Sequence, residues 1–241
     1  RRGGPDLAYR VAVTAFEEKF QLAASADTIN VPAGRILARA TVVNGEVETS
    51  FQNVPSFVYL REQQVEVAGV GLVEFDVAYG GAFYAFVQTG LKLEPANFSR
   101  LIEHGRLIKQ AVMSKFPIKH PFEDDLSFLY GTIFIGPPHD PSHHSRNVCI
   151  FADGELDRSP TGSGVSARAA LHFAAGELAL NERITIESIL GTTMSVKVAS
   201  VTTFGPYDAV IPEVSGTASI IGRNEFYFDP EDPFRNGFIL R

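Results

Sequence analysis

The stretch DRSPTGSGVSAR, residues 157–168, places an acid, a proline and a Thr-Gly-Ser-Gly turn directly before a helical pattern. Pro160 fixes the approach of the chain, and Gly162 and Gly164 permit a tight turn whose backbone N–H groups point outward. A helix that starts near Val165 begins with N–H groups that lack partners within the helix, and its dipole favours an anion there. The stretch therefore predicts a site for a carboxylate or a phosphate.

Three side chains of this stretch are candidates to contact the same ligand. The hydroxyls of Thr161 and Ser163 can cap the helix or contact the anion. Asp157, four residues before Thr161, can bind a cation at the other end of the ligand, and an amino acid carries this pair of charges. A plainer interpretation stays open on the residues alone: the hydroxyls only cap a helix, the glycines only form a turn, and Asp157 is a solvated acid.

Composition excludes several classes of function. The chain has 241 residues, 45% of them apolar, enough for one large domain or two smaller lobes. A formal net charge of -7 without a cluster of Lys and Arg argues against nucleic acid or an anionic membrane as a partner. No apolar run reaches the roughly 20 residues of a membrane span. The single Cys149, within NVCIF, predicts a small buried side chain, no disulfide framework and a reducing, cytoplasmic location.

The order of predicted elements repeats. A helix is expected at 7–20, followed by strands at 28–31, 34–42 and 47–54, with the Asn44-Gly45 pair as a hairpin turn. The second half, offset by roughly 157 residues, shows the same order: a helix at 165–180 and strands at 184–187, 192–200 and 207–216, with Gly205-Pro206 as a turn. Strand-like runs at 70–87 and 126–136 and a helix at 97–116 lie between the copies.

These elements predict an α+β protein built from two similar lobes. Small ligands usually bind in a cleft between such lobes. Tyr79, Gly80 and Gly81, between two strand-like runs, either line this cleft or form a simple turn. The run HDPSHHS at 139–145 holds three histidines but lies in a proline-rich segment without the spacing of a metal site, so no metal is expected there.

DRSPTGSGVSARAAL at 157–171 resembles the second active-site motif of the proline racemase family, which includes 4-hydroxyproline epimerases and trans-3-hydroxy-L-proline dehydratases. Racemases and epimerases carry Cys at the position of Thr161, and the Thr form resembles the dehydratase branch. Other segments resemble the dehydratases in the same order: NVPSF at 53–57, VAYGGAFYAFV at 77–87, DLSFLYGTI at 125–133, NVCIFADGELDRSPTGSG at 147–164 and DPEDPFRNGFIL at 229–240.

The resemblance implies two lobes of the diaminopimelate-epimerase type, each a β-rich shell around a central helix. Residues 1–65, completed by about 224–241, would then belong to a truncated first lobe, and residues 66–223 would form the second. It also implies site roles: Thr161 at the second catalytic position, Asp157 on the ring amine of the substrate, and the backbone N–H groups of Gly162 and Ser163 on its carboxylate. A small amino acid is the expected partner, and a homodimer is an ordinary assembly for such a family.

A threonine at this position changes the expected chemistry. Two thiols can invert the configuration of an α-carbon, because a Cys pKa of about 8.5 is easily lowered beside a helix N-terminus. A threonine hydroxyl is a far weaker acid, so racemisation should be lost. If the substrate carries a 3-hydroxyl, the carbanion formed by α-proton removal can expel it. The resemblance thus implies dehydration of trans-3-hydroxy-L-proline to pyrroline-2-carboxylate, without a metal or organic cofactor.

The other lobe should carry a motif like MCGH with the base cysteine. Subtracting the offset from Thr161 places it near Gly4, within RRGGPDLAY, where Cys and His are absent. Cys149 is no substitute, since by resemblance it lies on a strand of the opposite lobe. Two interpretations stay open: a dehydratase whose base lies upstream of Arg1, or an inactive family member that binds proline-like ligands. A proline racemase or hydroxyproline epimerase is a third, disfavoured by Thr161.

Overall fold

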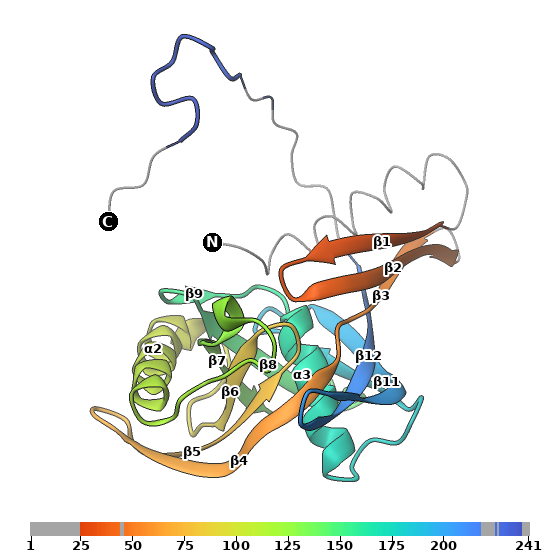
Figure 1. Ribbon diagram of the computed structural model, residues 1–241. Helices are drawn as coiled ribbons and strands as arrows, with labels where there is room; N and C mark the ends of the chain where they lie inside the picture. Colours follow the sequence, from red (N-terminus) through yellow and green to blue (C-terminus); the bar gives the residue numbers. More distant parts are fainter. Residues whose placement is uncertain (1–24, 44–45, 218–224, 226, 238–241) are drawn as a thin grey trace.

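The computed structural model describes residues 25–43, 46–217, 225 and 227–237, which form twelve strands, two α-helices and two short 3₁₀ helices (Figure 1). The strands are β1 (Ser25–Val31), β2 (Gly34–Val43), β3 (Glu46–Gln52), β4 (Ser56–Val67), β5 (Gly71–Tyr79), β6 (Phe83–Gln88), β7 (Leu129–Gly136), β8 (Ser145–Phe151), β9 (Glu155–Leu156), β10 (Arg183–Glu187), β11 (Thr193–Phe204) and β12 (Tyr207–Gly216). The helices are η1 (Pro95–Asn97), α2 (Phe98–Lys115), η2 (Asp124–Leu126) and α3 (Gly162–Ala174).

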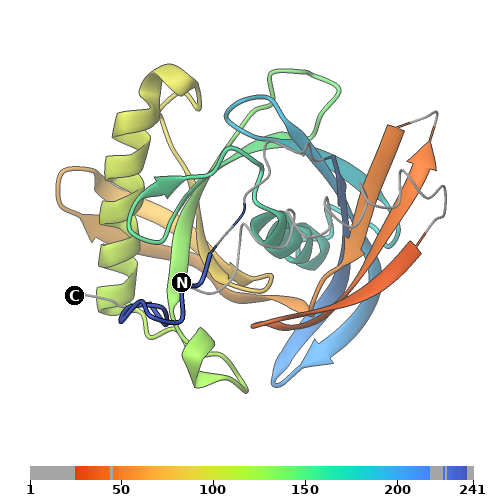
Figure 2. The same cartoon turned by 90° about the horizontal axis from the view of Figure 1, so that it is seen from above.

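Eight of these strands close into a barrel. Their order is β12-β11-β10-β8-β7-β6-β5-β4, and β4 returns to β12 through the pairs Ala209↔Phe57 and Val210↔Ser56. Most neighbours are antiparallel, but β6–β7 and β8–β10 are parallel. Closure leaves these strands without a free edge over most of the ring. Figure 2 looks into this ring and shows α3 inside it.

Helix α3 fills the barrel because its sequence is small and apolar on every side. Residues 164–171 are all buried, and the helix contacts β4, β5, β11 and β12. A helix that is apolar all round is typical of a buried position, and its alanines keep it thin enough for a ring of this size. Two buried residues of α3 break the pattern, the hydroxyl-bearing Ser166 and the charged Arg168.

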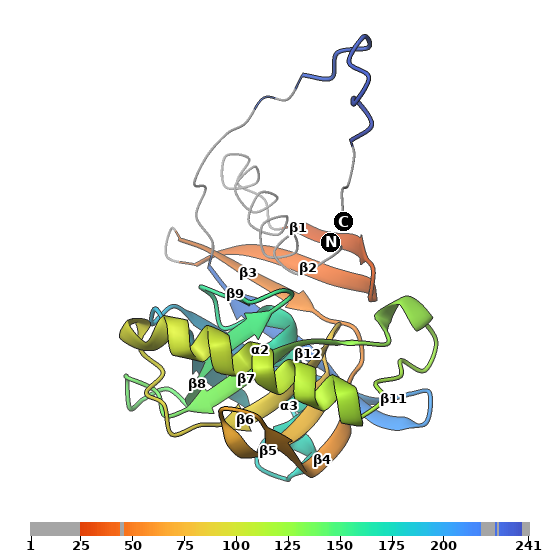
Figure 3. The same cartoon turned by 90° about the vertical axis from the view of Figure 1, so that its left-hand side faces the viewer.

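Helix α2 covers the outside of the barrel. Leu101, Gly105, Ile108 and Val112 form a buried stripe at helical spacing, and the helix packs on β7, β4 and β8 (Figure 3). The approach to β8 is close: a Cβ on Gly105 would lie 2.6 Å from Cβ of Ile150. Glycine at this position therefore lets the helix lie against the sheet.

Strand β12 connects the barrel to a second group of strands. Its first part pairs with β4, whereas Glu213–Gly216 pair with residues 49–52 of β3. Strands β3, β2 and β1 continue from there as an antiparallel meander that leaves the ring. In Figures 1 and 3 these three strands lie above the barrel, and β3 adjoins β12. The sheet thus continues beyond the shell around α3.

The structure confirms an α+β architecture and most of the predicted strands, but several bounds differ, the run at 70–87 forms two strands (β5 and β6), and β8 and β9 were not among the predicted runs. The helix predicted at 165–180 is α3, which starts three residues earlier and ends before Gly176, where φ is +73°. Strand β4 was not predicted. The expected helix at 7–20, the Asn44-Gly45 turn and the motif position near Gly4 lie outside the described residues. The boundary predicted at 65/66 falls inside β4, and the division into lobes stays a prediction.

None of the helices in the described ranges combines the length and hydrophobicity required for a membrane-spanning segment.

Candidate active site

The loop between β9 and α3 folds around the carboxylate of Asp157. The Asp157 amide donates to the carbonyl of Cys149 on β8, at 3.0 Å, which ties the loop to the barrel wall. The Oδ1 atom accepts hydrogen bonds from the amide (2.8 Å) and the hydroxyl (2.9 Å) of Ser159. The Oδ2 atom accepts from Oγ1 of Thr161 at 2.8 Å. The predicted cation-binding acid is therefore held in one orientation and stays half-buried.

Thr161 precedes α3 in a backbone conformation that is rare for its residue type. Its φ is +68° and its ψ is 98°, and its side chain makes no capping hydrogen bond to the helix. Positive φ is costly for a β-branched residue, by about 1–3 kcal/mol. Thr161 is 7% exposed. The interpretation of Thr161 as an N-cap is wrong, because its hydroxyl is directed to Asp157.

The first turn of α3 offers backbone donors. The first helical hydrogen bond runs from the amide of Val165 to the carbonyl of Thr161, at 2.7 Å. The amides of Gly162, Ser163 and Gly164 precede it, so they are the donors that a helix leaves unsatisfied at its start. The hydroxyl of Ser163 is not a cap either, since it hydrogen-bonds the hydroxyl of Tyr84 at 2.8 Å. Half-buried amides at the positive end of a helix are suited to bind a carboxylate.

The turn between β5 and β6 lies directly against this first turn. A Cβ on Gly80 would come within 2.2 Å of the carbonyl oxygen of Ser163 and 2.6 Å of the amide nitrogen of Ala167. Nδ2 of Asn53 donates to the carbonyl of Gly80 (2.8 Å) and to Oγ of Ser166 (2.9 Å). Gly80 therefore belongs to a turn that packs against the first turn of α3, and its place in a cleft between lobes stays a prediction.

Two titratable groups beneath the loop are kept neutral. Burial raises the pKa of the Cys149 thiol, and the nearby Asp157 carboxylate raises it further. Burial also raises the pKa of Tyr84 well above its ordinary value. Cys149 is 0% exposed, which confirms its prediction as a small buried side chain. Neither group is arranged to act as a base at neutral pH.

The histidine-rich segment at 139–145 contacts the carboxylate of Glu187. The amides of His139 and Asp140 donate to the carboxylate of Glu187 at 2.8 and 2.9 Å, Nδ1 of His143 lies 2.9 Å from it, and Arg146 forms an ion pair with it. Within the described ranges, no group of three or more His, Cys, Asp and Glu side chains is placed to hold a metal ion.

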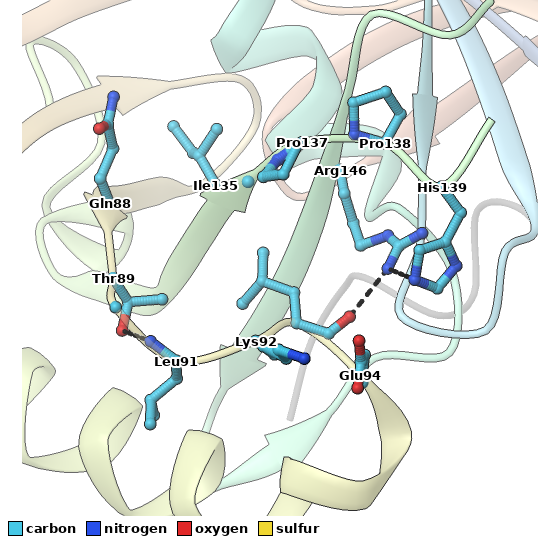
Figure 4. Close-up of a pocket in the computed structure, with 13 residues that line it drawn as sticks. Gln88, Thr89, Leu91, Lys92, Glu94, Ile135, Pro137, Pro138, His139 and Arg146 are labelled. Carbon is cyan, nitrogen blue, oxygen red and sulfur yellow. Dashed lines mark hydrogen bonds between the residues drawn. The ribbon is translucent and has the colours of Figure 1, made fainter. Parts of the chain in front are cut away.

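A pocket of about 510 Å³ lies away from the candidate site. It is formed where β6 and β7 end, whereas the Gly80 turn that contacts α3 lies before the start of β6. Figure 4 shows Arg146 in its wall, donating to the carbonyl of Leu93 at 2.9 Å and lying 2.6 Å from Nε2 of His139. The most basic group of this pocket therefore has both terminal nitrogens occupied, the second by Glu187.

Comparison with known proteins identifies the family of this chain. The sequence model of the proline racemase family matches residues 13–239. The chain belongs to the proline racemase family. It is 56% identical over 217 residues to a trans-3-hydroxy-L-proline dehydratase from Colwellia psychrerythraea and 39% identical over 217 residues to a proline racemase from Clostridioides difficile. Each match covers 88% of the chain but 61% and 65% of the relatives, so the chain spans less than two thirds of either.

A solved structure of the family has the same fold. A hydroxyproline epimerase from Agrobacterium vitis, crystallised with bound trans-4-hydroxy-L-proline, superimposes with a TM-score of 0.84 at 30% identity, over 96% of this chain and 69% of that one. The family resemblance expected from the sequence is thereby confirmed.

The four predicted site residues of this family member lie together: Asp157 and Thr161 in the loop, Gly162 and Ser163 in the first turn of α3. Three supporting residues were not predicted, namely Asn53, Tyr84 and Asn147. All three are buried polar side chains within segments that resemble the family, and this polarity among apolar neighbours was the available signal.

Proposed function

We propose that this member of the proline racemase family dehydrates trans-3-hydroxy-L-proline to pyrroline-2-carboxylate. The hydrogen bond from Thr161 to Asp157 is the main observation behind the proposal. The residue at the second catalytic position is a hydroxyl whose proton is directed to a carboxylate, so it is not available as an acid matched to an α-carbon. The similarity of the chain to a dehydratase supports the same conclusion.

The substrate would bind through its two charges. The amides of Gly162 and Ser163 would hold its carboxylate at the positive end of α3, where charge that develops on the carboxylate during α-proton removal is also stabilised. The Asp157 carboxylate would accept from the ring ammonium group. Thr161, whose Oγ1 donates to Asp157, keeps a lone pair as an acceptor for a second N–H of that group.

Stereochemistry explains why one acid–base group can be sufficient. In the trans isomer the carboxylate and the 3-hydroxyl lie on opposite faces of the ring, so the α-hydrogen and the hydroxyl share a face. A base on that face takes the α-proton, the C2–C3 double bond forms, the C3–O bond breaks, and the same group returns the proton to the departing oxygen as water. The ring then tautomerises to the imine. Thr161 would lie on the other face and would not need to titrate.

The base itself is expected from the first lobe. RRGGPDLAY, at the position predicted for its motif near Gly4, lies outside the described residues and contains neither the Cys nor the His of that motif, so this segment does not supply the expected base. Assignment of the two lobes to residues 1–65 with 224–241 and to 66–223 is part of the proposal. The separate β1–β3 meander supports a division into two parts, but barrel strand β4 (Ser56–Val67) crosses the boundary predicted at 65/66. A homodimer, a small amino acid as the partner and a cytoplasmic location remain predictions.

Binding of proline-like ligands without turnover is a second candidate. It is favoured by the groups that the described site supplies, which bind charges but include no evident base. A proline racemase or hydroxyproline epimerase is disfavoured by Thr161.

Mass spectrometry and chiral chromatography of three parallel incubations separate these functions. The substrates are trans-3-hydroxy-L-proline, trans-4-hydroxy-L-proline and L-proline. The proposal predicts loss of water from the first and no change of configuration in the other two. Inversion of L-proline or trans-4-hydroxy-L-proline would instead identify a racemase or epimerase. If all three substrates remain unchanged while calorimetry detects binding of pyrrole-2-carboxylate, a planar ring carboxylate, the protein binds proline-like ligands without turnover.

A further inference from the structure

The peptide group between Pro160 and Thr161 is held at both of its polar ends. Its carbonyl, on Pro160, accepts a hydrogen bond from Nδ2 of Asn147 at 3.0 Å. Its N–H, on Thr161, donates to Oγ of Ser159 at 3.1 Å. Because a peptide group is planar, these two contacts fix its rotation. That rotation contributes directly to the φ of Thr161, which is +68°.

The orientation of Asn147 is in turn fixed from behind. Its Oδ1 accepts from a terminal nitrogen of Arg168, at 3.0 Å, so the amide nitrogen must face Pro160. Arg168 lies inside the barrel on α3 and is 2% exposed, and Asn147 is 1% exposed. The same guanidinium donates to Oγ of Ser145 at 2.6 Å and to Nε2 of His172 at 2.8 Å. Solvent therefore does not compete for these groups.

Two strained or costly features thus meet at one peptide. A β-branched residue at positive φ is unfavourable, and so is a buried guanidinium whose direct hydrogen-bond acceptors here are neutral. Surrounding contacts must maintain such a conformation, and residues of this kind cluster at ligand sites. Asn147 is the side chain that connects the two features.

We propose that Asn147 is a positioning residue of the active site: by holding the Pro160–Thr161 peptide, it directs the Thr161 hydroxyl to Asp157 and aims the first amides of α3 at the substrate carboxylate. This inference rests on the proposed function, because it assigns Asn147 to the same substrate site. Asn147 itself touches no substrate; it acts through Pro160 and Thr161. Ser159 performs the matching task at the other end of the peptide.

The substitution Asn147→Asp separates positioning from stability. A carboxylate has the same shape and still accepts from Arg168, and it supplies a counter-charge to that buried cation. It has no proton to donate to the carbonyl of Pro160, and its oxygen would repel that carbonyl. The variant should therefore keep the wild-type melting temperature or exceed it, while kcat/KM for trans-3-hydroxy-L-proline falls by about 100-fold, the loss expected for a displacement of roughly 1 Å.

Thr132→Val is the matched control. Thr132 is also buried, and its hydroxyl donates to the carbonyl of Gly105, which fastens α2 to the outside of the barrel. This variant should lose stability and keep kcat/KM. Ser159→Ala removes the acceptor of the Thr161 amide and also one donor to Asp157, so its loss of kcat/KM should be at least as large as that of Asn147→Asp.

A crystal structure of Asn147→Asp gives a readout that does not depend on turnover. The proposal predicts that the Pro160–Thr161 peptide rotates and that Thr161 leaves positive φ. Wild-type kcat/KM in this variant, or an unchanged Thr161 conformation, would overturn the inference. If the wild-type protein dehydrates none of its substrates, the proposed function fails. The role of Asn147 is then decided by the crystal structure of Asn147→Asp and by the affinity for pyrrole-2-carboxylate. That affinity should be weaker in Asn147→Asp than in the wild type.

Discussion

The Thr161 hydroxyl lies 2.8 Å from Oδ2 of Asp157 and donates to it, although Thr161 occupies the position from which a side chain would usually cap the following helix. The helix start is consequently left open to an external anion, and the carboxylate that would receive the ring amine is held in place.

Replacing Thr161 by valine keeps the branched shape and removes the hydroxyl. The Asp157 carboxylate loses one of its three side-chain and backbone donors, and a hydrogen bond to a charged group contributes about 1.5–3 kcal/mol. We expect KM for trans-3-hydroxy-L-proline to rise by about 10-fold or more. Steady-state kinetics check this, with Thr161→Ser as the control that retains the hydroxyl. Equal KM values in Thr161→Val and wild type would show that the contact does not serve substrate binding.

Replacing Thr161 by cysteine supplies a titratable proton at the proposed second catalytic position, with an ordinary pKa of about 8.5. The variant should gain the ability to reprotonate the α-carbon from the face opposite to the base. We therefore predict that D-proline forms from L-proline in Thr161→Cys and not in the wild type, as followed by chiral chromatography. Formation of D-proline at the same rate by both proteins would refute the role assigned to the threonine.

Gly80 should tolerate no side chain. An alanine Cβ there would lie 2.2 Å from the carbonyl oxygen of Ser163, a backbone atom that cannot move without displacing α3. Overpacking of this kind costs about 1–3 kcal/mol, so Gly80→Ala should lower the free energy of unfolding by at least that amount in urea titrations. Gly90→Ala is the control, because no atom lies within 4 Å of a Cβ at Gly90. Similar midpoints for the two variants would argue against the tight contact.

The Glu187 cluster should make stability depend on acid pH. Burial opposes ionisation of this carboxyl, but the amides of His139 and Asp140 and the Arg146 side chain outweigh it and lower the pKa of Glu187 in the folded state. A depressed folded-state pKa stabilises the protein above the unfolded value of about 4.5. That contribution is lost as pH falls below it.

Glu187→Gln tests this linkage. The variant should be less stable than wild type at pH 7, and the difference should shrink steadily below about pH 4.5. Thermal melts across pH 3–7 measure it. If the stability difference between wild type and Glu187→Gln instead grew toward low pH, Glu187 would not be a carboxylate that the fold stabilises in its ionised form.

The sequence made the loop and most strands predictable, because local signals determine them. Pro160, the glycines and the Asn-Gly and Gly-Pro pairs act within a few residues of themselves. The start of α3 was misplaced by three residues because Gly-Ser-Gly has low helix propensity. Tertiary packing nevertheless requires glycine at two of these positions. A Cβ on Gly162 would lie 3.3 Å from Phe51, and a Cβ on Gly164 would lie 2.3 Å from Ile133.

Strand β4 escaped prediction for a related reason. Its outer part, REQQVEV, is polar and partly exposed, and only its alternating valines Val65 and Val67 are buried there. Its closure of the barrel by pairing with β12 depends on a partner about 150 residues away. Local propensity contains no information about such a pairing.

The supporting residues of the site could not be derived from spacing. Asn53 meets Ser166 across 113 positions, and Tyr84 meets Ser163 across 79. Each becomes visible only when the fold brings the segment after β3, strand β6 and helix α3 together. The residues of the loop itself, Asp157 to Ser163, could be named from the sequence because they are contiguous.

The most direct test of the proposed dehydration is proton NMR of the protein with trans-3-hydroxy-L-proline in D₂O. We expect the substrate signals to decay into pyrroline-2-carboxylate and the substrate still present to keep its configuration. Formation of cis-3-hydroxy-D-proline, the C2 epimer, or no decay of the substrate signals would contradict it.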